Sequence, residues 1–398
     1  MRIRIVSFLL FLPIILSAQI RRGDLQVTYS LRNGHYEALV NKKGWAEPKT
    51  VPLCEESTLS MVPVEGPALY REDSSRSLYK ALIKPFSQYL KSGDNIYFVP
   101  AGNIHFINLG ALTDESGKRL RDMFTFHRLS SWEEYSKEED KPYRASWLLF
   151  GGMDYLADPE RMYASVRMLH IHNVEHLYKD IVPAGPVNEL SFGVAEDGTR
   201  AGYGNLEHSR GEIKDLWGIR EYGMTFFTGF KACEEQFRSM IRRNDPFIAL
   251  ISTHGFTKGH GDYTTCGLLF SGAGHTIEGR ELPYNLNDGI LYDKEIETLD
   301  MSAASMVVLA ACNTGLGIVT QEGVNGLQSA FKKAGAQTLV MTLWSVNDRA
   351  AGAFTKSLFT HIGKSKTKHE AFEAAIRDLK DSEEFSDPAY WAPFIMLD

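Results

Sequence analysis

Two residues with the chemistry of a base and a nucleophile each follow a short apolar stretch of this 398-residue sequence. His254 comes after the apolar residues 247–251, and Cys312 comes after residues 307–311. A free thiol has a pKa of about 8.5, so a nucleophilic cysteine needs a base or a positive neighbour. Histidine is the usual base because its pKa lies near neutrality. The pair therefore predicts covalent catalysis by a thiolate.

Both apolar stretches are predicted to be buried strands that end at functional loops. Parallel strands present their carboxyl ends at one edge of a sheet, where the ligand crevice of an open α/β sheet lies. His254 and Cys312 are thus expected to be neighbours although 58 residues separate them. The backbone N–H groups of Gly255 and Cys312 are the predicted oxyanion donors. From Gly255 to Gly261 the sequence predicts a glycine-rich mobile loop.

Taken singly, each of the two residues fits a structural role better than a catalytic one. A lone cysteine on an apolar strand usually packs as a small buried residue, and a lone histidine at a strand end is common. Here a glycine follows His254, and Asn313-Thr314-Gly315 follows Cys312. The combination in this order favours a catalytic dyad.

The other three cysteines, Cys54, Cys233 and Cys266, are expected to have a structural role. Four cysteines are too few for a disulfide-built scaffold, and three cannot all pair with one another. We therefore interpret them mainly as small buried apolar residues.

Strands that alternate with helices along the chain predict an α/β sandwich with a mostly parallel central sheet. Two alternating runs around Asn33-Gly34 indicate a β-hairpin. Apolar spacing predicts helices over residues 348–362 and 369–379. A turn at Gly151-Gly152, after a strand at 147–150, marks the predicted domain boundary. The expected organisation is a signal peptide at 1–18, an N-terminal half at 24–150 and a second half at 151–398.

Charge and composition exclude some classes of partner and fold. The formal net charge is −7, which provides no basic surface for nucleic acid, so no nucleic-acid partner is expected. Hydrophobic residues make up 43% of the chain and charged residues 23%, as in ordinary globular proteins. No fixed-period repeat is visible, so a solenoid has no support.

The first eighteen residues have the pattern of a secretory signal peptide. Arg2 and Arg4 precede an apolar run over residues 5–16, and Ser17-Ala18 provides small residues at a cleavage point. The run is shorter than the about 20 residues that span a bilayer. We expect export to the periplasm or the medium, with no membrane association after cleavage. An uncleaved N-terminal anchor is the alternative, and an unused signal would leave the protein in the cytoplasm.

One short string of residues has the spacing of a zinc site. His172-Asn173-Val174-Glu175-His176 matches the H-x-x-E-H string of inverted zinc metalloproteases and would place both histidines on one helix face. The neighbouring segment offers no obvious third ligand, so a polar helix face is favoured. P-loop, dinucleotide-binding and G-x-S-x-G patterns do not occur. We expect neither a metal nor an organic cofactor.

Around these residues the sequence resembles the CHAT family, caspase-like proteins associated with TPR repeats and related to caspases and separases. The resemblance extends over roughly residues 24–398. It rests on the motifs at residues 97–106, 251–255, 288–291, 299–300, 308–315, 322–324, 343–348 and 390–394.

The resemblance implies a caspase-like α/β/α fold in which a degenerate caspase-like half, 24–150, precedes an active half, 151–398. It also implies a cysteine endopeptidase of protein or peptide substrates, with His254 as base and Cys312 as nucleophile, and a regulatory protein partner. Asn313 stands where family members often carry Glu, and the usual TPR array is missing. Asp348 is a candidate for an acidic substrate pocket, with a solvated or structural aspartate as the alternative. The alternative function is an interaction or scaffold module that does not cut unless a partner engages it.

Overall fold

The computed structural model describes most of the chain between residue 23 and the C-terminus. Three features named above lie outside the described residues: the segment 1–18, the string 172–176, and Cys312 with residues 313–315. The described residues are 23–62, 66–135, 145–167, 169, 207–217, 219, 223–242, 244–260, 263–310, 318–320, 323–364 and 367–398.

Two compact units divide the chain. The first comprises Met1–Glu138 with Leu397–Asp398, and the second comprises Glu139–Met396. The boundary predicted after residue 150 differs from this division, because the strand that ends at Gly151 pairs in parallel with strands of the second unit. The connection between the units therefore precedes this strand.

The first unit is built around a mixed sheet. Its strands, within the described residues, lie in the order β3-β2-β1-β4-β5, and Leu397 pairs in parallel with Arg128 on β5. The predicted hairpin is confirmed: β1 and β2 pair antiparallel around Asn33 and Gly34, which both have positive φ. The elements are β1 (Asp24–Arg32), β2 (His35–Lys42), β3 (Lys49–Glu55), α3 (Glu72–Leu82), β4 (Asn95–Val99), β5 (Thr125–Arg128) and α4 (Trp132–Tyr135).

The second unit contains the sheet that positions the predicted dyad. Within the described residues its strand order is β16-β15-β12-β8-β6-β7, and the pairs β15–β12, β12–β8, β8–β6 and β6–β7 are all parallel. All six residues of β8 are buried, as expected for a central parallel strand. The strands are β6 (Ser146–Gly151), β7 (Met224–Phe227), β8 (Phe247–Ser252), β12 (Ala304–Ala310), β15 (Leu339–Thr342) and β16 (Phe394–Leu397).

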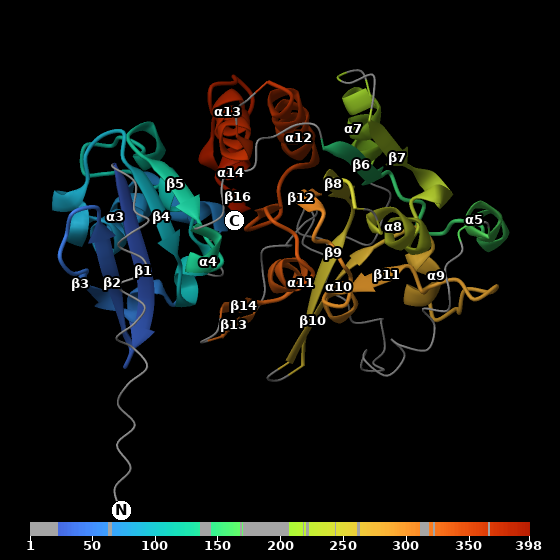
Figure 1. Ribbon diagram of the computed structural model, residues 1–398, viewed down its shortest axis with the longest axis horizontal. Helices are drawn as coiled ribbons and strands as arrows, with labels where there is room; N and C mark the ends of the chain where they lie inside the picture. Colours follow the sequence, from blue (N-terminus) through green and yellow to red (C-terminus); the bar gives the residue numbers. More distant parts are fainter. Residues whose placement is uncertain are drawn as a thin grey trace, which may run out of the picture. The chain divides into compact units, whose positions relative to one another are not determined.

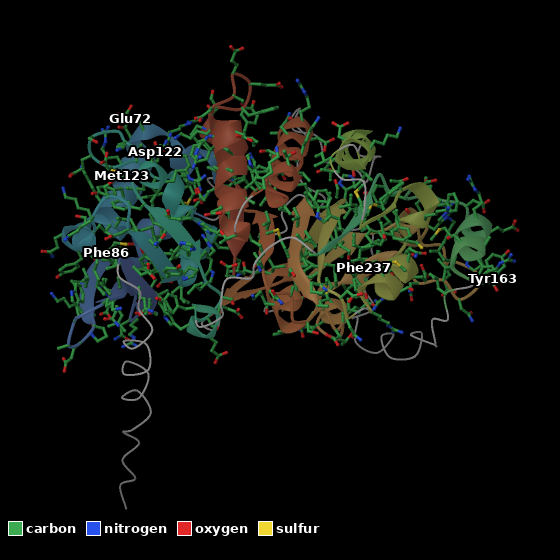
Figure 2. The ribbon with its side chains drawn as sticks, turned by 45° about the horizontal axis from the view of Figure 1, so that its top comes forward. Glu72, Phe86, Asp122, Met123, Tyr163 and Phe237 are labelled. Atoms are coloured by element: carbon green, nitrogen blue, oxygen red, sulfur yellow. The ribbon has the colours of Figure 1, made fainter. Side chains whose placement is uncertain are left out.

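Helices cover both faces of this sheet. On β6, the Trp147 ring contacts Phe359 of α12, whereas Phe150, which points to the opposite face, contacts Phe237 of α8. Figure 1 shows α7, α12 and α13 on one side of the strands and α8 and α11 on the other, and Figure 2 labels Phe237 on α8. The helices are α5 (Pro159–Val166), α7 (Glu207–Trp217), α8 (Glu234–Ile241), α9 (Ala273–Ile277), α10 (Asp293–Ile296), α11 (Leu327–Lys333), α12 (Asp348–Ile362), α13 (Lys368–Lys380) and α14 (Pro388–Trp391).

The predicted α/β class, with a mostly parallel sheet between helical layers, is thus confirmed. The predicted loop from Gly255 to Gly261 is wrong for its first six residues, which form strand β9 (Gly255–His260). β9 pairs antiparallel with β10 (Tyr263–Leu269), which in turn pairs with β11 (Ile290–Tyr292). The residues of β9 favour a loop by their own pattern, but hydrogen bonds to the neighbouring strand hold them extended.

Two further strands, β13 (Ile318–Thr320) and β14 (Gly323–Asn325), form a separate antiparallel pair. Among the described residues, no helix combines the length and apolar character needed to cross a membrane.

Candidate active site

Three parallel strands of the second unit end together at one edge of the sheet. Ser252, the last residue of β8, is in register with Ala310, the last residue of β12, and with Gly151, the last residue of β6. The N–H of Thr253 continues the ladder by donating to the carbonyl of Ala310 at 3.3 Å. His254 follows Ser252 by two residues, and in the sequence Cys312 follows Ala310 by two residues.

His254 is half-buried and lies between the end of β8 and the start of β9. Its carbonyl accepts a hydrogen bond from the N–H of Leu269 on β10 at 2.9 Å. Its neighbour Gly255 is buried and is paired with Leu268. The main chain around the predicted base is therefore held on one side by the β8 ladder and on the other by β10.

Tyr155 is the aromatic neighbour of His254. It lies in the segment after β6 and is 2% exposed. Its ring centroid is 5.4 Å from that of His254, with the planes tilted by 37°. Its hydroxyl is 3.0 Å from Oγ1 of Thr253 and accepts a hydrogen bond from the His254 N–H at 3.4 Å. Tyr155 thus contacts the predicted base through both its ring and its hydroxyl.

Helix α7 fixes the carboxyl ends of β6 and β8 from one helical layer. The hydroxyl of Ser209 accepts from the Gly152 N–H at 2.8 Å and donates to the Ser252 carbonyl at 3.0 Å. One turn further on, the carboxyl of Glu212 accepts a hydrogen bond from the Ser252 hydroxyl at 2.7 Å. Burial raises the pKa of Glu212 to about 7, and the charge of Asp348 adds to the increase.

Gly151 makes this close approach possible. A Cβ added at this position would lie 2.8 Å from Oγ of Ser209 and 2.9 Å from Cγ1 of Ile213. Both contacts are shorter than carbon side chains tolerate, so a side chain here would push α7 away from the strand ends.

Asp348, the candidate pocket residue, is the first residue of α12 and is half-buried. The preceding residue, Asn347, caps the helix by accepting hydrogen bonds from the N–H groups of Arg349 and Ala350. The charge of Asp348 contributes to the raised pKa of Glu212, whose carboxyl accepts the hydrogen bond from Ser252. Its predicted role in substrate recognition stays a prediction.

The cysteines inside the described residues have different surroundings from those a nucleophile needs. Cys54, Cys233 and Cys266 are free thiols; Cys233 and Cys266 are buried, and Cys54 is half-buried. Burial raises the pKa of Cys266 to about 11 and that of Cys233 well above its usual value. Such thiols stay protonated at neutral pH, which agrees with the predicted structural role of Cys233 and Cys266.

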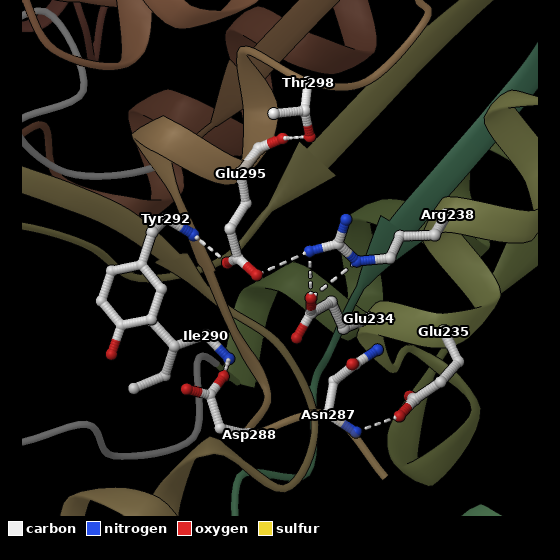
Figure 3. A network of polar contacts seen from close by, with 9 residues as sticks. All are labelled: Glu234, Glu235, Arg238, Asn287, Asp288, Ile290, Tyr292, Glu295 and Thr298. Carbon is white, nitrogen blue, oxygen red and sulfur yellow. Dashed lines mark hydrogen bonds and ion pairs between the residues drawn. The ribbon is translucent and has the colours of Figure 1, made fainter. Parts of the chain in front are cut away.

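A second polar cluster surrounds Arg238, which we call the Arg238 network (Figure 3). The guanidinium Nη2 of Arg238 lies 2.6 Å from Oε1 of Glu234 on the same helix and 3.0 Å from Oε1 of Glu295 on α10. Arg238 is 2% exposed and Glu234 is 1% exposed, so both charges are buried. The second carboxylate oxygen of Glu295 accepts the N–H of Tyr292, closing the first turn of α10.

Two more acidic residues border the Arg238 network. Oε1 of Glu235 accepts the N–H of Asn287 at 2.6 Å, and Oδ1 of Asp288 accepts the N–H of Ile290 at 2.8 Å. Burial raises the pKa of Glu235 and of Asp288 to about 7, and that of Glu295 to about 8. The motif at residues 288–291 thus has a structural role, since it shapes the turn that leads into β11.

Sequence reasoning missed the residues that support His254: Tyr155, Ser209, Glu212 and Thr253. His254 and Cys312 were selected because each is a reactive side chain that follows an apolar strand. The same rule applies to the segment after Gly151-Gly152 and would have included Tyr155. Ser209 and Glu212 carry no comparable signal, because they face the strand end only once α7 is packed.

A mostly parallel sheet between helical layers, with a histidine at the carboxyl edge of a central strand, defines an α/β sandwich protein. The CHAT domain model matches residues 72–397, and this chain belongs to the CHAT domain family. The match includes the motif at residues 97–106 in the first unit and the complete second unit.

Curated relatives match a shorter part of the chain. Tetratricopeptide repeat protein 28 of Homo sapiens is 29% identical over 102 residues, which is 25% of this chain and 4% of that protein. Its Mus musculus counterpart is 28% identical over 95 residues, or 24% of this chain and 4% of that protein. The chain thus spans a small fraction of the length of these relatives.

Two solved structures show a distant structural similarity to this chain. The Arg-specific cysteine proteinase gingipain R has a TM-score of 0.42 and 8% identity, covering 82% of this chain and 66% of that one. The Saccharomyces cerevisiae separase in complex with securin has a TM-score of 0.38 and 12% identity, covering 76% of this chain and 15% of that one.

Proposed function

We propose that the protein is a cysteine endopeptidase in which His254 is the base and Cys312 is the nucleophile. The observation that carries the proposal is the register of β8 and β12. Ser252 and Ala310 are paired at the ends of adjacent parallel strands, and each is followed two residues later by a member of the dyad. Membership of the CHAT family supports the same assignment.

The proposed reaction has two steps. The Cys312 thiolate attacks the carbonyl carbon of a peptide bond, and His254 donates a proton to the leaving amine, so that an acyl-thioester remains. His254 then takes a proton from water, whose oxygen attacks the thioester. The thiolate leaves, and the carboxylic acid that forms gives its proton to solvent. The N–H groups of Gly255 and Cys312 are the proposed donors to the negative oxygen of each tetrahedral intermediate. The substrates are protein segments that reach the strand edge in extended form.

The test is covalent labelling of the mature protein with peptidyl acyloxymethyl ketones that differ in the P1 residue. We expect labelling of the wild type at a single cysteine, and loss of labelling in Cys312→Ala and His254→Ala. Cys54→Ala is the matched control because Cys54 is half-buried, in contrast to the buried Cys233 and Cys266. This variant should label at the wild-type rate.

Folded wild-type protein that no electrophile labels, alone or with a candidate partner, would contradict the peptidase. That result would favour the alternative, an interaction or scaffold module. The matching relatives are tetratricopeptide repeat proteins by name, which supports a protein partner under either function. Labelling with and without the partner therefore belongs in the same experiment.

Export is a separate part of the proposal and rests on the sequence of residues 1–18. Expression in a host with a secretory pathway, followed by N-terminal sequencing of the mature protein, tests it. An N-terminus near residue 19 supports cleavage by a signal peptidase, whereas an intact Met1 contradicts it.

A further inference from the structure

We propose that Tyr155 is a positioning residue that holds His254 in its working orientation. This inference rests on the proposed function, because it assigns His254 the role of base. Tyr155 comes from the segment after β6, whose last residue, Gly151, is in register with the last residue of the His254 strand. The packing of two adjacent strands therefore brings Tyr155 and His254 together.

The hydrogen bonds around Tyr155 have one consistent direction. The Leu269 carbonyl only accepts, so the hydroxyl of Thr253 must donate its single proton to it. Oγ1 of Thr253 is then an acceptor toward Tyr155, and the Tyr155 hydroxyl donates across the 3.0 Å separation. The oxygen of Tyr155 accepts the N–H of His254 at 3.4 Å.

A fourth hydrogen bond closes this arrangement into a ring. The Leu269 N–H donates to the His254 carbonyl at 2.9 Å. The chain of donors and acceptors thus runs from the His254 N–H through Tyr155, Thr253 and Leu269 and returns to the His254 carbonyl. Both main-chain polar groups of His254 are held, and each hydroxyl in the ring uses its only proton within it. We call these four residues the His254 hydrogen-bond cycle.

The side chain of Tyr155 acts on the imidazole in a second way. Its ring lies 5.4 Å from that of His254 at a tilt of 37°, within the range of attractive aromatic contacts. Because Tyr155 is 2% exposed, its own ring is fixed by packing and forms a rigid wall beside the imidazole. A base must lie within hydrogen-bond reach of its partner, and small displacements of such a group cost large factors in rate.

Two substitutions separate the parts of this arrangement. Tyr155→Phe removes the hydroxyl and breaks the His254 hydrogen-bond cycle, while it keeps the aromatic ring beside the imidazole. Thr253→Val removes the middle hydroxyl and keeps Tyr155 intact, so it carries the test if Tyr155→Phe fails to fold. We expect either variant to reduce the rate of electrophile labelling at Cys312 by about 10-fold or more.

The matched control is Tyr70→Phe in the first unit. Tyr70 is likewise 2% exposed, and its hydroxyl accepts a backbone N–H, that of Asn108, at 2.8 Å. Its loss has a similar cost in stability but should leave the labelling rate unchanged. Thr253→Ser keeps the hydroxyl that takes part in the His254 hydrogen-bond cycle, so it should retain a labelling rate close to that of the wild type.

A spectroscopic readout distinguishes a failure of this inference from a failure of the peptidase proposal. In protein labelled with ¹⁵N-histidine, the His254 signals, assigned with His254→Gln, should shift in Tyr155→Phe and Thr253→Val, and their pH titration should change. Tyr70→Phe should leave them unchanged. Unshifted His254 signals, or labelling of Tyr155→Phe at the wild-type rate, would overturn the inference. Wild-type protein that does not label, but whose His254 signals respond to Tyr155→Phe, contradicts the peptidase and supports the positioning role.

Discussion

Gly289, in the motif at residues 288–291, has a φ of +77°, a conformation that side chains rarely adopt. A Cβ at this position would lie 2.6 Å from the backbone nitrogen of Ala273, at the start of α9. Because the obstacle is backbone and not a flexible side chain, the turn cannot accommodate it by a rotamer change. Packing of the turn against α9 explains the glycine in this motif without any catalytic role.

We expect Gly289→Ala to destabilise the fold by about 2–4 kcal/mol, from the strained φ and from the displaced backbone. The control is Gly352→Ala in α12, where no atom lies within 4 Å of the added Cβ. Alanine there should stabilise the helix by about 0.5–1 kcal/mol. Urea denaturation measures both, and equal effects of the two substitutions would contradict the assignment.

Among the secondary structure elements, α8 and α10 depend on the Arg238 network for their contact. The side chain of Arg238, on α8, forms ion pairs with Glu234 on the same helix and with Glu295 on α10. Apart from the network, Phe237 of α8 packs on Phe150 of β6. Because a buried charge without its partners is strongly destabilising, the two carboxyl partners of Arg238 favour this contact between α8 and α10.

Removal of this cation should be far more costly than removal of a cation whose carboxylate partner is exposed. Arg238→Met leaves two buried carboxyls without their cation, and we expect a loss of about 3–5 kcal/mol in the free energy of unfolding. Arg76→Met in α3 is the control, because Arg76 also pairs with a glutamate four residues earlier, Glu72, whose side chain is 72% exposed. Its loss should cost about 0.5 kcal/mol. Thermal and urea denaturation measure both costs. A similar cost at the two sites would contradict this prediction.

For the whole molecule, buried carboxyls link folding to protonation. Burial raises the pKa of Glu212, Glu235 and Asp288 to about 7 and that of Glu295 to about 8. In the unfolded chain the same groups ionise near pH 4. Between about pH 4 and pH 7–8 the folded state therefore binds more protons than the unfolded state. The stability that these carboxyls contribute is fully present below about pH 4 and is lost as the pH rises through 7–8.

Glu212→Gln isolates one of these groups. Glutamine keeps an acceptor for the Ser252 hydroxyl and cannot ionise, so we expect the variant to match the wild type near pH 4. It should then become about 3 kcal/mol more stable than the wild type as the pH rises through 7, with no further gain above pH 8. Urea denaturation across this pH range measures the difference. Glu383→Gln is the control, because the Glu383 carboxyl is exposed to water in both states; a pH-independent difference for Glu212→Gln would refute the linkage.

Residue patterns along the chain determined the local elements and the candidate dyad. Alternation and an Asn-Gly turn predicted the β1–β2 hairpin, and helical spacing predicted α12 with the bounds that the structure has. Apolar stretches predicted β8 and β12, because burial depends on the side chains of the strand itself. The choice of His254 likewise followed from its place after such a strand.

The tertiary structure alone decided which strands are neighbours and where they end relative to one another. The register of Ser252 with Ala310 and Gly151, the contact of Tyr155 with His254, and the strand formed by β9 all depend on partners distant in the sequence. A strand carries its own hydrophobic pattern but not the identity of its neighbour, because backbone hydrogen bonds are the same for every residue. The supports of His254 were therefore decided by packing, whereas His254 itself could be found from the sequence.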